Sequence, residues 1–223
     1  MITIPYQGSF NLYNTDFSPH ANFVDFIQPK TFKKLRDEFP ADKLFKDEVP
    51  EHRKYGQRPH CRRFMCWGET QNSRYFKPYM IDLKILPDIW QQFCNYIVTN
   101  AEYRYFIRET LRVNDFKIRL DFHRTRKDLD VSPHTDSKGK IGSHLFYFMP
   151  KEWEDGDGGK TIFYRGKKVN RMNPEPQDFE DAVTCSVIGN RSCLFKNTEE
   201  GWHGVTQVKS SLDRQIFNLV ILK

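Results

Sequence analysis

The chain has 223 residues with a formal net charge of +6, and 38% of its residues are hydrophobic. This length and apolar content suffice for one domain with a substantial core, and the 15% of aromatic residues predicts an aromatic-rich core. No apolar run is long enough to span a membrane, and residues 1–10 lack the basic and apolar regions of a secretion signal. We therefore expect a soluble, cytoplasmic protein.

The first predicted elements along the chain are helical. Residues 29–40 show an amphipathic pattern that Pro40 ends, whereas residues 41–85 look irregular and contain several Pro and Gly residues. Residues 86–113 form the strongest helical stretch, and Asn100 is placed to cap and so to divide it into two helices. The irregular stretch is a candidate lid over a pocket, with a mobile surface loop as the simpler interpretation.

From Phe116 onward the hydrophobic period changes to two, which is typical of strands. Further short strands are expected up to the end of the chain, and Gly189 with Asn190 gives a hairpin-turn signal between two of them. Helices followed by a run of strands predict an α+β fold. We expect a single domain over residues 1–223, in which residues 1–113 form a helical and irregular support and residues 114–223 a jelly-roll-like barrel.

Cysteine usage and charge limit the classes of ligand. Five cysteines, an odd number, fit a reducing compartment better than a disulfide framework. His60, Cys61 and Cys66 raise the alternative of a zinc site, but no second cysteine pair follows, so ordinary thiols are the better interpretation. The modest basic excess favours small anionic ligands over nucleic acid, because no nucleic-acid-binding motif accompanies it.

A metal site is the sharpest functional signal in the sequence. His134 and Asp136 lie two positions apart at what looks like the end of a strand, so both side chains could point into a barrel. His203 follows a later strand and a short loop, where a barrel could return it to the first pair. Two imidazoles and one carboxylate suit Fe(II) with open coordination positions, but zinc hydrolases use the same donors, so the triad leaves the metal open.

Arg214 stands at the start of the apolar strand at residues 214–222, inside the predicted barrel. A buried charge without a partner is very costly, and a guanidinium binds a carboxylate through two parallel hydrogen bonds. Arg214 is therefore a candidate for binding the carboxylate of a ligand. A structural salt bridge is the simpler alternative.

Several stretches taken in order resemble the Fe(II)/2-oxoglutarate-dependent dioxygenases, especially the prolyl-hydroxylase-like branch: SPHTD, LFYFMPKEW, DGGKTIFY, VIGNRSCLF, GWHGV and LDRQIFNLVIL. The resemblance covers residues 115–223 and implies a double-stranded β-helix, a cupin-like barrel with supporting N-terminal helices. It implies that His134, Asp136 and His203 hold Fe(II). It also implies that Arg214 binds the distal carboxylate of 2-oxoglutarate, and Asn218, on the same strand face, is a further candidate for cosubstrate binding.

The resemblance implies that O2 and 2-oxoglutarate are consumed, with succinate and CO2 released, and that an unactivated C–H bond is hydroxylated. The substrate stays open between a prolyl or other peptidyl residue and an amino-acid-like small molecule. The alternative function is a non-catalytic β-barrel that binds a metal, a sugar or a protein partner. The oligomeric state is not predicted.

Some positions depart from the prolyl-hydroxylase-like branch. Arg124 stands at the ungapped position of a tyrosine that often precedes the first metal ligand and reaches 2-oxoglutarate. Phe148 stands where a tyrosine hydroxyl could help to bind the distal carboxylate, and His144, on the same predicted face, is a candidate to replace it. These departures bear on the substrate more than on the cofactor.

Overall fold

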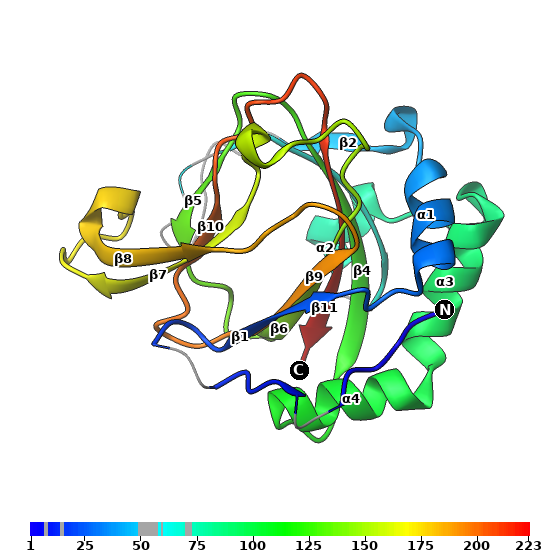
Figure 1. Ribbon diagram of the computed structural model, residues 1–223, viewed down its shortest axis with the longest axis horizontal. Helices are drawn as coiled ribbons and strands as arrows, with labels where there is room; N and C mark the ends of the chain where they lie inside the picture. Colours follow the sequence, from blue (N-terminus) through cyan, green and yellow to red (C-terminus); the bar gives the residue numbers. More distant parts are fainter. Residues whose placement is uncertain (7–8, 14–15, 49–57, 59, 70–72) are drawn as a thin grey trace.

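The protein is described by a computed structural model, which covers residues 1–6, 9–13, 16–48, 58, 60–69 and 73–223. Its strands form two sheets, and the two longest helices lie against the larger one (Figure 1). The larger sheet has the order β1-β9-β6-β11-β4-β3-β2, and the smaller sheet has the order β5-β10-β7-β8. The predicted α+β class is confirmed. The assignment of residues 1–223 to one domain stays a prediction.

The elements have the following bounds. The larger sheet contains β1 (His20–Val24), β2 (Lys46–Glu48), β3 (Arg62–Gly68), β4 (Lys117–Thr125), β6 (Lys140–Tyr147), β9 (Arg191–Lys196) and β11 (Arg214–Leu222). The smaller sheet contains β5 (Val131–His134), β7 (Thr161–Lys167), β8 (Phe179–Thr184) and β10 (His203–Val205). The helices are α1 (Pro29–Asp37), α2 (Ser73–Phe76), α3 (Asp88–Thr99) and α4 (Ala101–Leu111). Short 3-10 helices occupy Asp42–Leu44, Lys77–Tyr79, Leu83–Ile85, Asp155–Asp157 and Pro176–Asp178.

The helices begin and end where the local sequence requires. Pro29 opens α1, where its missing N–H leaves no helical bond unmade, and Pro40 follows the end of the helix. Asn100 separates α3 from α4, because its side-chain oxygen accepts a hydrogen bond from the Tyr103 N–H at 2.7 Å. The predicted division at Asn100 is confirmed.

One face of the larger sheet packs against the helices and forms the main core. Alternation along β4 and β11 turns one set of apolar residues to this side: Ile118, Leu120, Phe122, Phe217, Leu219 and Ile221. The Trp90 ring lies 5.0–5.2 Å from the rings of Phe148 and Phe217, measured between centroids, and its Nε1 donates to the Leu35 carbonyl oxygen at 3.0 Å. The core is therefore aromatic-rich, as the composition predicts.

The opposite face, which we call the inner face, carries Arg214, Ile216 and Asn218 on β11 and looks toward the smaller sheet. The Tyr147 hydroxyl of β6 donates to Thr161 Oγ1 of β7 at 2.8 Å, which joins the two sheets directly. We call the region between the inner face and the smaller sheet the inter-sheet space. Every residue discussed below as part of a site borders it.

Three predictions about secondary structure were wrong. Residues 41–85 are not irregular, because they contain β2, β3, α2 and three short 3-10 helices. The strand β1 precedes the first helix, whereas no strand was expected before residue 116. Gly189, with φ of +75°, does not close a hairpin, because β8 and β9 belong to different sheets and the chain crosses between them.

The predicted lid cannot be placed as a whole, because residues 49–57, 59 and 70–72 lie outside the described residues. The described part of that stretch includes β3, which pairs with both β2 and β4 and so belongs to the sheet. No helix among the described residues is long and apolar enough to cross a membrane.

His144 and Phe148 face the helices, so the suggestion that His144 replaces the missing tyrosine hydroxyl in binding a ligand carboxylate was wrong. The two ring nitrogens of His144 lie 3.1 Å from the Tyr103 hydroxyl and 3.1 Å from Ser192 Oγ. Phe148 stacks on Phe32 with the ring centroids 5.2 Å apart. The reason is the two-residue period of β6, which gives the inner face to Leu145 and Tyr147 instead.

Burial of His144 predicts acid sensitivity of the fold. Burial lowers the pKa of His144 from 6.5 to about 3, so its contribution to stability is complete above pH 6.5 and is lost as the pH falls toward 3. The free energy of unfolding should decrease from pH 6.5 to pH 4.5 in both the native protein and His144→Phe. We expect this decrease to be about 2 kcal/mol smaller in His144→Phe, which lacks the buried imidazole. Urea denaturation at both pH values measures this difference, and equal pH dependence in the two proteins would contradict it.

Candidate functional site

Three potential metal ligands come together where β5 and β10 pair. His134 ends β5, His203 begins β10, and the two residues face each other directly in the antiparallel register. Asp136 lies in the loop beyond β5, not on the strand itself as the sequence suggested. One ligand atom from each of the three lies within 4.8 Å of the others. Among the described residues, this is the one group of His, Cys, Asp or Glu side chains with such geometry.

Both histidines are oriented by the backbone. His134 Nδ1 lies 3.0 Å from the Ser132 carbonyl oxygen, and His203 Nδ1 lies 2.8 Å from that of Gly201. Since a carbonyl only accepts, each Nδ1 carries the proton and each Nε2 keeps its lone pair for a metal ion.

The protonation states also suit metal binding. Burial lowers the pKa of His134 to about 3 and also lowers the pKa of His203, so both imidazoles are neutral near pH 7. Burial alone would raise the pKa of the Asp136 carboxyl, but nearby positive charge, above all that of Lys140, lowers it well below its usual range. Two neutral imidazoles and one carboxylate are the deprotonated donors that a divalent metal ion requires.

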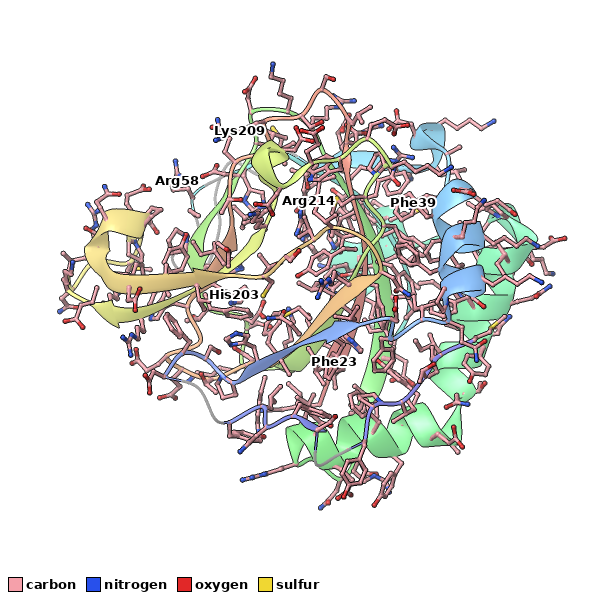
Figure 2. All side chains as sticks on the ribbon, viewed as in Figure 1. Phe23, Phe39, Arg58, His203, Lys209 and Arg214 are labelled. Carbon is pink, nitrogen blue, oxygen red and sulfur yellow. The ribbon has the colours of Figure 1, made fainter. Side chains whose placement is uncertain are left out.

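Arg214 is buried in the inter-sheet space, with 5% of its surface exposed. Its Nε donates to the Gly159 carbonyl oxygen at 2.6 Å, which fixes the orientation of the guanidinium. None of the ion pairs among the described residues involves Arg214, and burial lowers its pKa to about 10. No salt bridge among the described residues therefore explains this buried charge. Figure 2 shows Arg214 and His203 on the same side of the larger sheet, opposite Phe39.

Gly159 makes room for this arginine. A Cβ at Gly159 would lie 3.0 Å from Arg214 Cδ and 3.1 Å from the Trp153 ring, and the backbone there has φ of +64°. A side chain at this position would strain the backbone and press against Arg214 and Trp153. The Gly-rich turn before β7 positions Arg214 rather than a phosphate group.

Tyr147 and Thr161 are site residues that the sequence analysis missed. Tyr147 lies on the inner face opposite Ile216, and its hydroxyl donates to Thr161 Oγ1. Both faces of β6 are largely apolar, so alternation could not decide which of Tyr147 and Phe148 points inward. The useful signal would have been the tyrosine hydroxyl, because a buried tyrosine usually needs a polar partner.

Buried polar atoms around the inter-sheet space lack hydrogen-bond partners among the described residues. They are Asn218 Oδ1, Ser143 Oγ and Trp153 Nε1. Asn218 lies on the inner face of β11 opposite Asp121 of β4, and Trp153 contacts the position of Gly159. Because most buried polar atoms in native proteins are hydrogen-bonded, these atoms indicate a polar ligand between the sheets.

Arg124 is not part of the site. Its Nη2 donates to the Pro40 carbonyl oxygen at 2.9 Å and its guanidinium lies over the rings of Phe39 and Phe45, on the helix side. Its neighbour His123 occupies the inner face instead, where burial lowers its pKa to about 3.

Arg119 and Asp121 also lie on the inner face of β4. The Arg119 Nε and Nη2 donate to the two carboxylate oxygens of Asp121 at 2.7 and 2.8 Å, so the two charges neutralise each other. The alternation of β4 was visible in the sequence, but its polar face was not expected to be the buried one. Cys66 is buried and Cys61 exposed, and neither belongs to the metal-type group found among the described residues.

Comparison with known proteins decides the family. Residues 120–221 match the family model of the 2OG-Fe(II) oxygenase superfamily. The resemblance inferred from the sequence is confirmed over these residues. The match supports an oxygenase enzyme that uses Fe(II), 2-oxoglutarate and O2. No curated protein matches the chain.

Several solved structures share the fold. A prolyl-4-hydroxylase of Pseudomonas putida has a TM-score of 0.60 at 12% identity, over 92% of this chain and 93% of that one. HygX from Streptomyces hygroscopicus, with nickel, 2-oxoglutarate and hygromycin B bound, has a TM-score of 0.59 at 10% identity, over 95% and 86%. A prolyl hydroxylase of Trichoplax adhaerens, in complex with a hypoxia-inducible-factor peptide, has a TM-score of 0.55 at 13% identity, over 91% and 83%.

The oxygenase cofactors fit the residues present. The His134, Asp136 and His203 donors match an Fe(II) triad, and Arg214 with the unpartnered Asn218 Oδ1 offers polar contacts to a dicarboxylate deeper between the sheets. The two groups of residues are separate, so metal binding and cosubstrate binding can be disturbed independently.

The Gly159→Ala substitution tests whether Arg214 must lie where it does. We expect at least a tenfold, about 1.4 kcal/mol, loss of 2-oxoglutarate affinity, with unchanged metal affinity because the triad lies elsewhere. Calorimetric titration of each ligand measures both quantities. Gly156→Ala is the matched control, because a Cβ there meets nothing within 4 Å. Equal affinities in the two variants would show that this contact does not position the arginine.

Proposed function

We propose that His134, Asp136 and His203 hold Fe(II), that Arg214 binds the distal carboxylate of 2-oxoglutarate, and that the enzyme hydroxylates an unactivated C–H bond. The observation that carries this proposal is the pair of oriented histidines beside a carboxylate, with a buried arginine that has no anionic partner among the described residues. The substrate is an amino-acid-like small molecule or a peptidyl residue.

We also propose that the two sheets form a double-stranded β-helix. Two sets of four antiparallel strands, β9-β6-β11-β4 and β5-β10-β7-β8, face each other across the inter-sheet space. The remaining strands β1, β2 and β3 extend the larger set at its edges, and the helices support its outer face. This arrangement supports a jelly-roll-type barrel in which the metal donors and the arginine come from opposite walls.

Bound Fe(II) would supply one reaction. In it, the decarboxylation of 2-oxoglutarate to succinate and CO2 is coupled to hydroxylation of the substrate with O2. His134, Asp136 and His203 would hold the metal ion, and the ion would supply the binding positions for cosubstrate and O2. The backbone contacts at Nδ1 fix the orientation of both imidazoles.

The chain's own residues bind and orient the cosubstrate. Arg214 is anchored through Nε, so its terminal N–H groups stay directed at a carboxylate. The hydroxyl groups of Tyr147 and Thr161 lie close to this position and can donate a further hydrogen bond. Asn218 lies two inner-face positions beyond Arg214 on β11, and it would contact the same ligand. Because Arg214 is almost fully buried, water does not compete for these contacts.

The fold relatives do not choose the substrate. The Trichoplax adhaerens structure contains a peptide, and the HygX structure contains the small molecule hygromycin B. The alternative of a non-catalytic barrel is not retained, since the superfamily match gives an oxygenase.

Anaerobic addition of 2-oxoglutarate to the Fe(II)-loaded protein tests the proposed roles, because the chelate gives a visible charge-transfer band. We expect the band in the native protein and its loss in Asp136→Ala. In Arg214→Ala we expect half-formation of the band to need about 100-fold more 2-oxoglutarate, because a charged, paired contact is removed.

Asp155→Ala is the matched control, because Asp155 forms an exposed ion pair with Lys160 away from the triad. Thermal unfolding of each variant checks that it is folded. A band of native strength in Asp136→Ala would exclude Asp136 as a ligand, and the absence of any band in well-folded native protein would contradict the proposed function.

A further inference from the structure

A lysine lies against the proposed metal site on the inner side of the protein. Lys140 begins β6, and its Nζ is 2.7 Å from Asp136 Oδ2. The same ammonium group lies 5.3 Å from the centroid of the Phe195 ring, and 14% of the side chain is exposed. Lys140 therefore brings a positive charge next to the triad in a largely buried position.

A buried hydroxyl accompanies this lysine. Ser143 lies on β6 directly opposite Phe195 of β9, so the two side chains share the inner face. The Phe195 ring is 4.8 Å from the ring of His203, which places this group beside the triad. Ser143 is fully buried, and its Oγ has no hydrogen-bond partner among the described residues. A hydroxyl without a partner in such a position indicates a ligand that the protein itself does not supply.

The charges of the proposed complex leave Lys140 without compensation. The positive charges of Fe(II) and Arg214 balance the negative charges of Asp136 and of the two carboxylates of 2-oxoglutarate. Arg119 and Asp121 neutralise each other through two hydrogen bonds. A metal ion on Asp136 would share this carboxylate with Lys140, so the largely buried ammonium would be stabilised by a second anion.

We propose that Lys140 and Ser143 bind a carboxylate of the substrate next to the metal. The ammonium and the hydroxyl can each donate to one carboxylate oxygen, which would hold the substrate in a fixed orientation toward the triad. This inference rests on the proposed function and narrows its substrate class. The substrate is a small, carboxylate-bearing molecule such as a free amino acid, and not an internal prolyl or other uncharged residue of a peptide, whose amide groups carry no charge.

Matched acid and amide pairs test the substrate class. The anaerobic Fe(II)–2-oxoglutarate complex is titrated with the standard L-amino acids and with their carboxamides, and perturbation of the visible band reports binding. Succinate formation in air is followed in parallel. We expect at least one acid to perturb the band and to stimulate succinate formation, and its carboxamide to bind at least tenfold more weakly. An amide that binds as well as its acid, or a set in which no acid perturbs the band, would overturn the proposal.

Variants of the subsite identify the residues responsible. We expect Lys140→Met to weaken binding of the acid at least tenfold without weakening that of the amide, Ser143→Ala to do so to a smaller extent, and Lys140→Arg to restore part of the affinity. Lys138→Met, at an exposed lysine in the same loop, should match the native protein. The 2-oxoglutarate concentration for half-formation of the band should stay unchanged in all four.

The outcomes separate this inference from the proposed function. If no band forms with 2-oxoglutarate in the native protein, the proposed function itself fails. If the band forms but Lys140→Met raises the 2-oxoglutarate requirement and leaves the acid preference unchanged, the lysine serves the cosubstrate and the inference is wrong. If thermal unfolding shows that Lys140→Met is poorly folded, Ser143→Ala decides. The same preference for the acid over its carboxamide in Ser143→Ala as in the native protein would overturn the shared carboxylate subsite.

Discussion

The antiparallel pairing of β5 with β10 sets His134 opposite His203, and the candidate site depends on that register. A slip of one residue would turn one imidazole to the far face of the smaller sheet and separate the two ring nitrogens. Gly204 helps to hold the register, because a Cβ there would lie 2.5 Å from the Val131 carbonyl oxygen. The close approach of the two strands thus limits the residue after His203 to glycine.

The packing of the helices on the larger sheet determines which side chains of that sheet face the paired strands β5 and β10. Apolar alternate residues of β4 and β11 are held against α3 and α4, so the intervening residues must point to the inner face. These include Arg119, Asp121 and Arg214, which would be costly to bury elsewhere without partners. The packing of the helices on the outer face therefore determines that Arg214 lies on the inner face of the larger sheet, opposite the candidate metal donors of the smaller sheet.

Much of this arrangement could be predicted from the sequence, and the failures have physical causes. The helical spacing of apolar residues predicted the helices, and Asn100 predicted their division. The His, Asp and Arg side chains and their spacing predicted the candidate triad and Arg214. Tyr147 was missed because both faces of β6 are apolar, so its sequence does not show which side points inward. Asp136 was placed on a strand that ends at His134, since pattern does not define where pairing stops.

The strands β1 and β3 were missed for a related reason. All seven residues of β3 are buried or partly buried, and charged Arg62 and Arg63 are among them, so no simple alternation appears. Lys140 was not singled out because its importance comes from a fold contact with Asp136 and not from a motif. Tertiary contacts of this kind become visible only once the sheets are placed.

Anomalous diffraction from crystals loaded with Fe(II), measured at the iron edge, tests the central claim most directly. The account predicts one strong peak bonded to Nε2 of His134, Nε2 of His203 and the Asp136 carboxylate, at about 2.0–2.2 Å from each donor. Both Nδ1 atoms should keep their backbone carbonyl partners. An ion bound elsewhere, or coordination through either Nδ1, would contradict it.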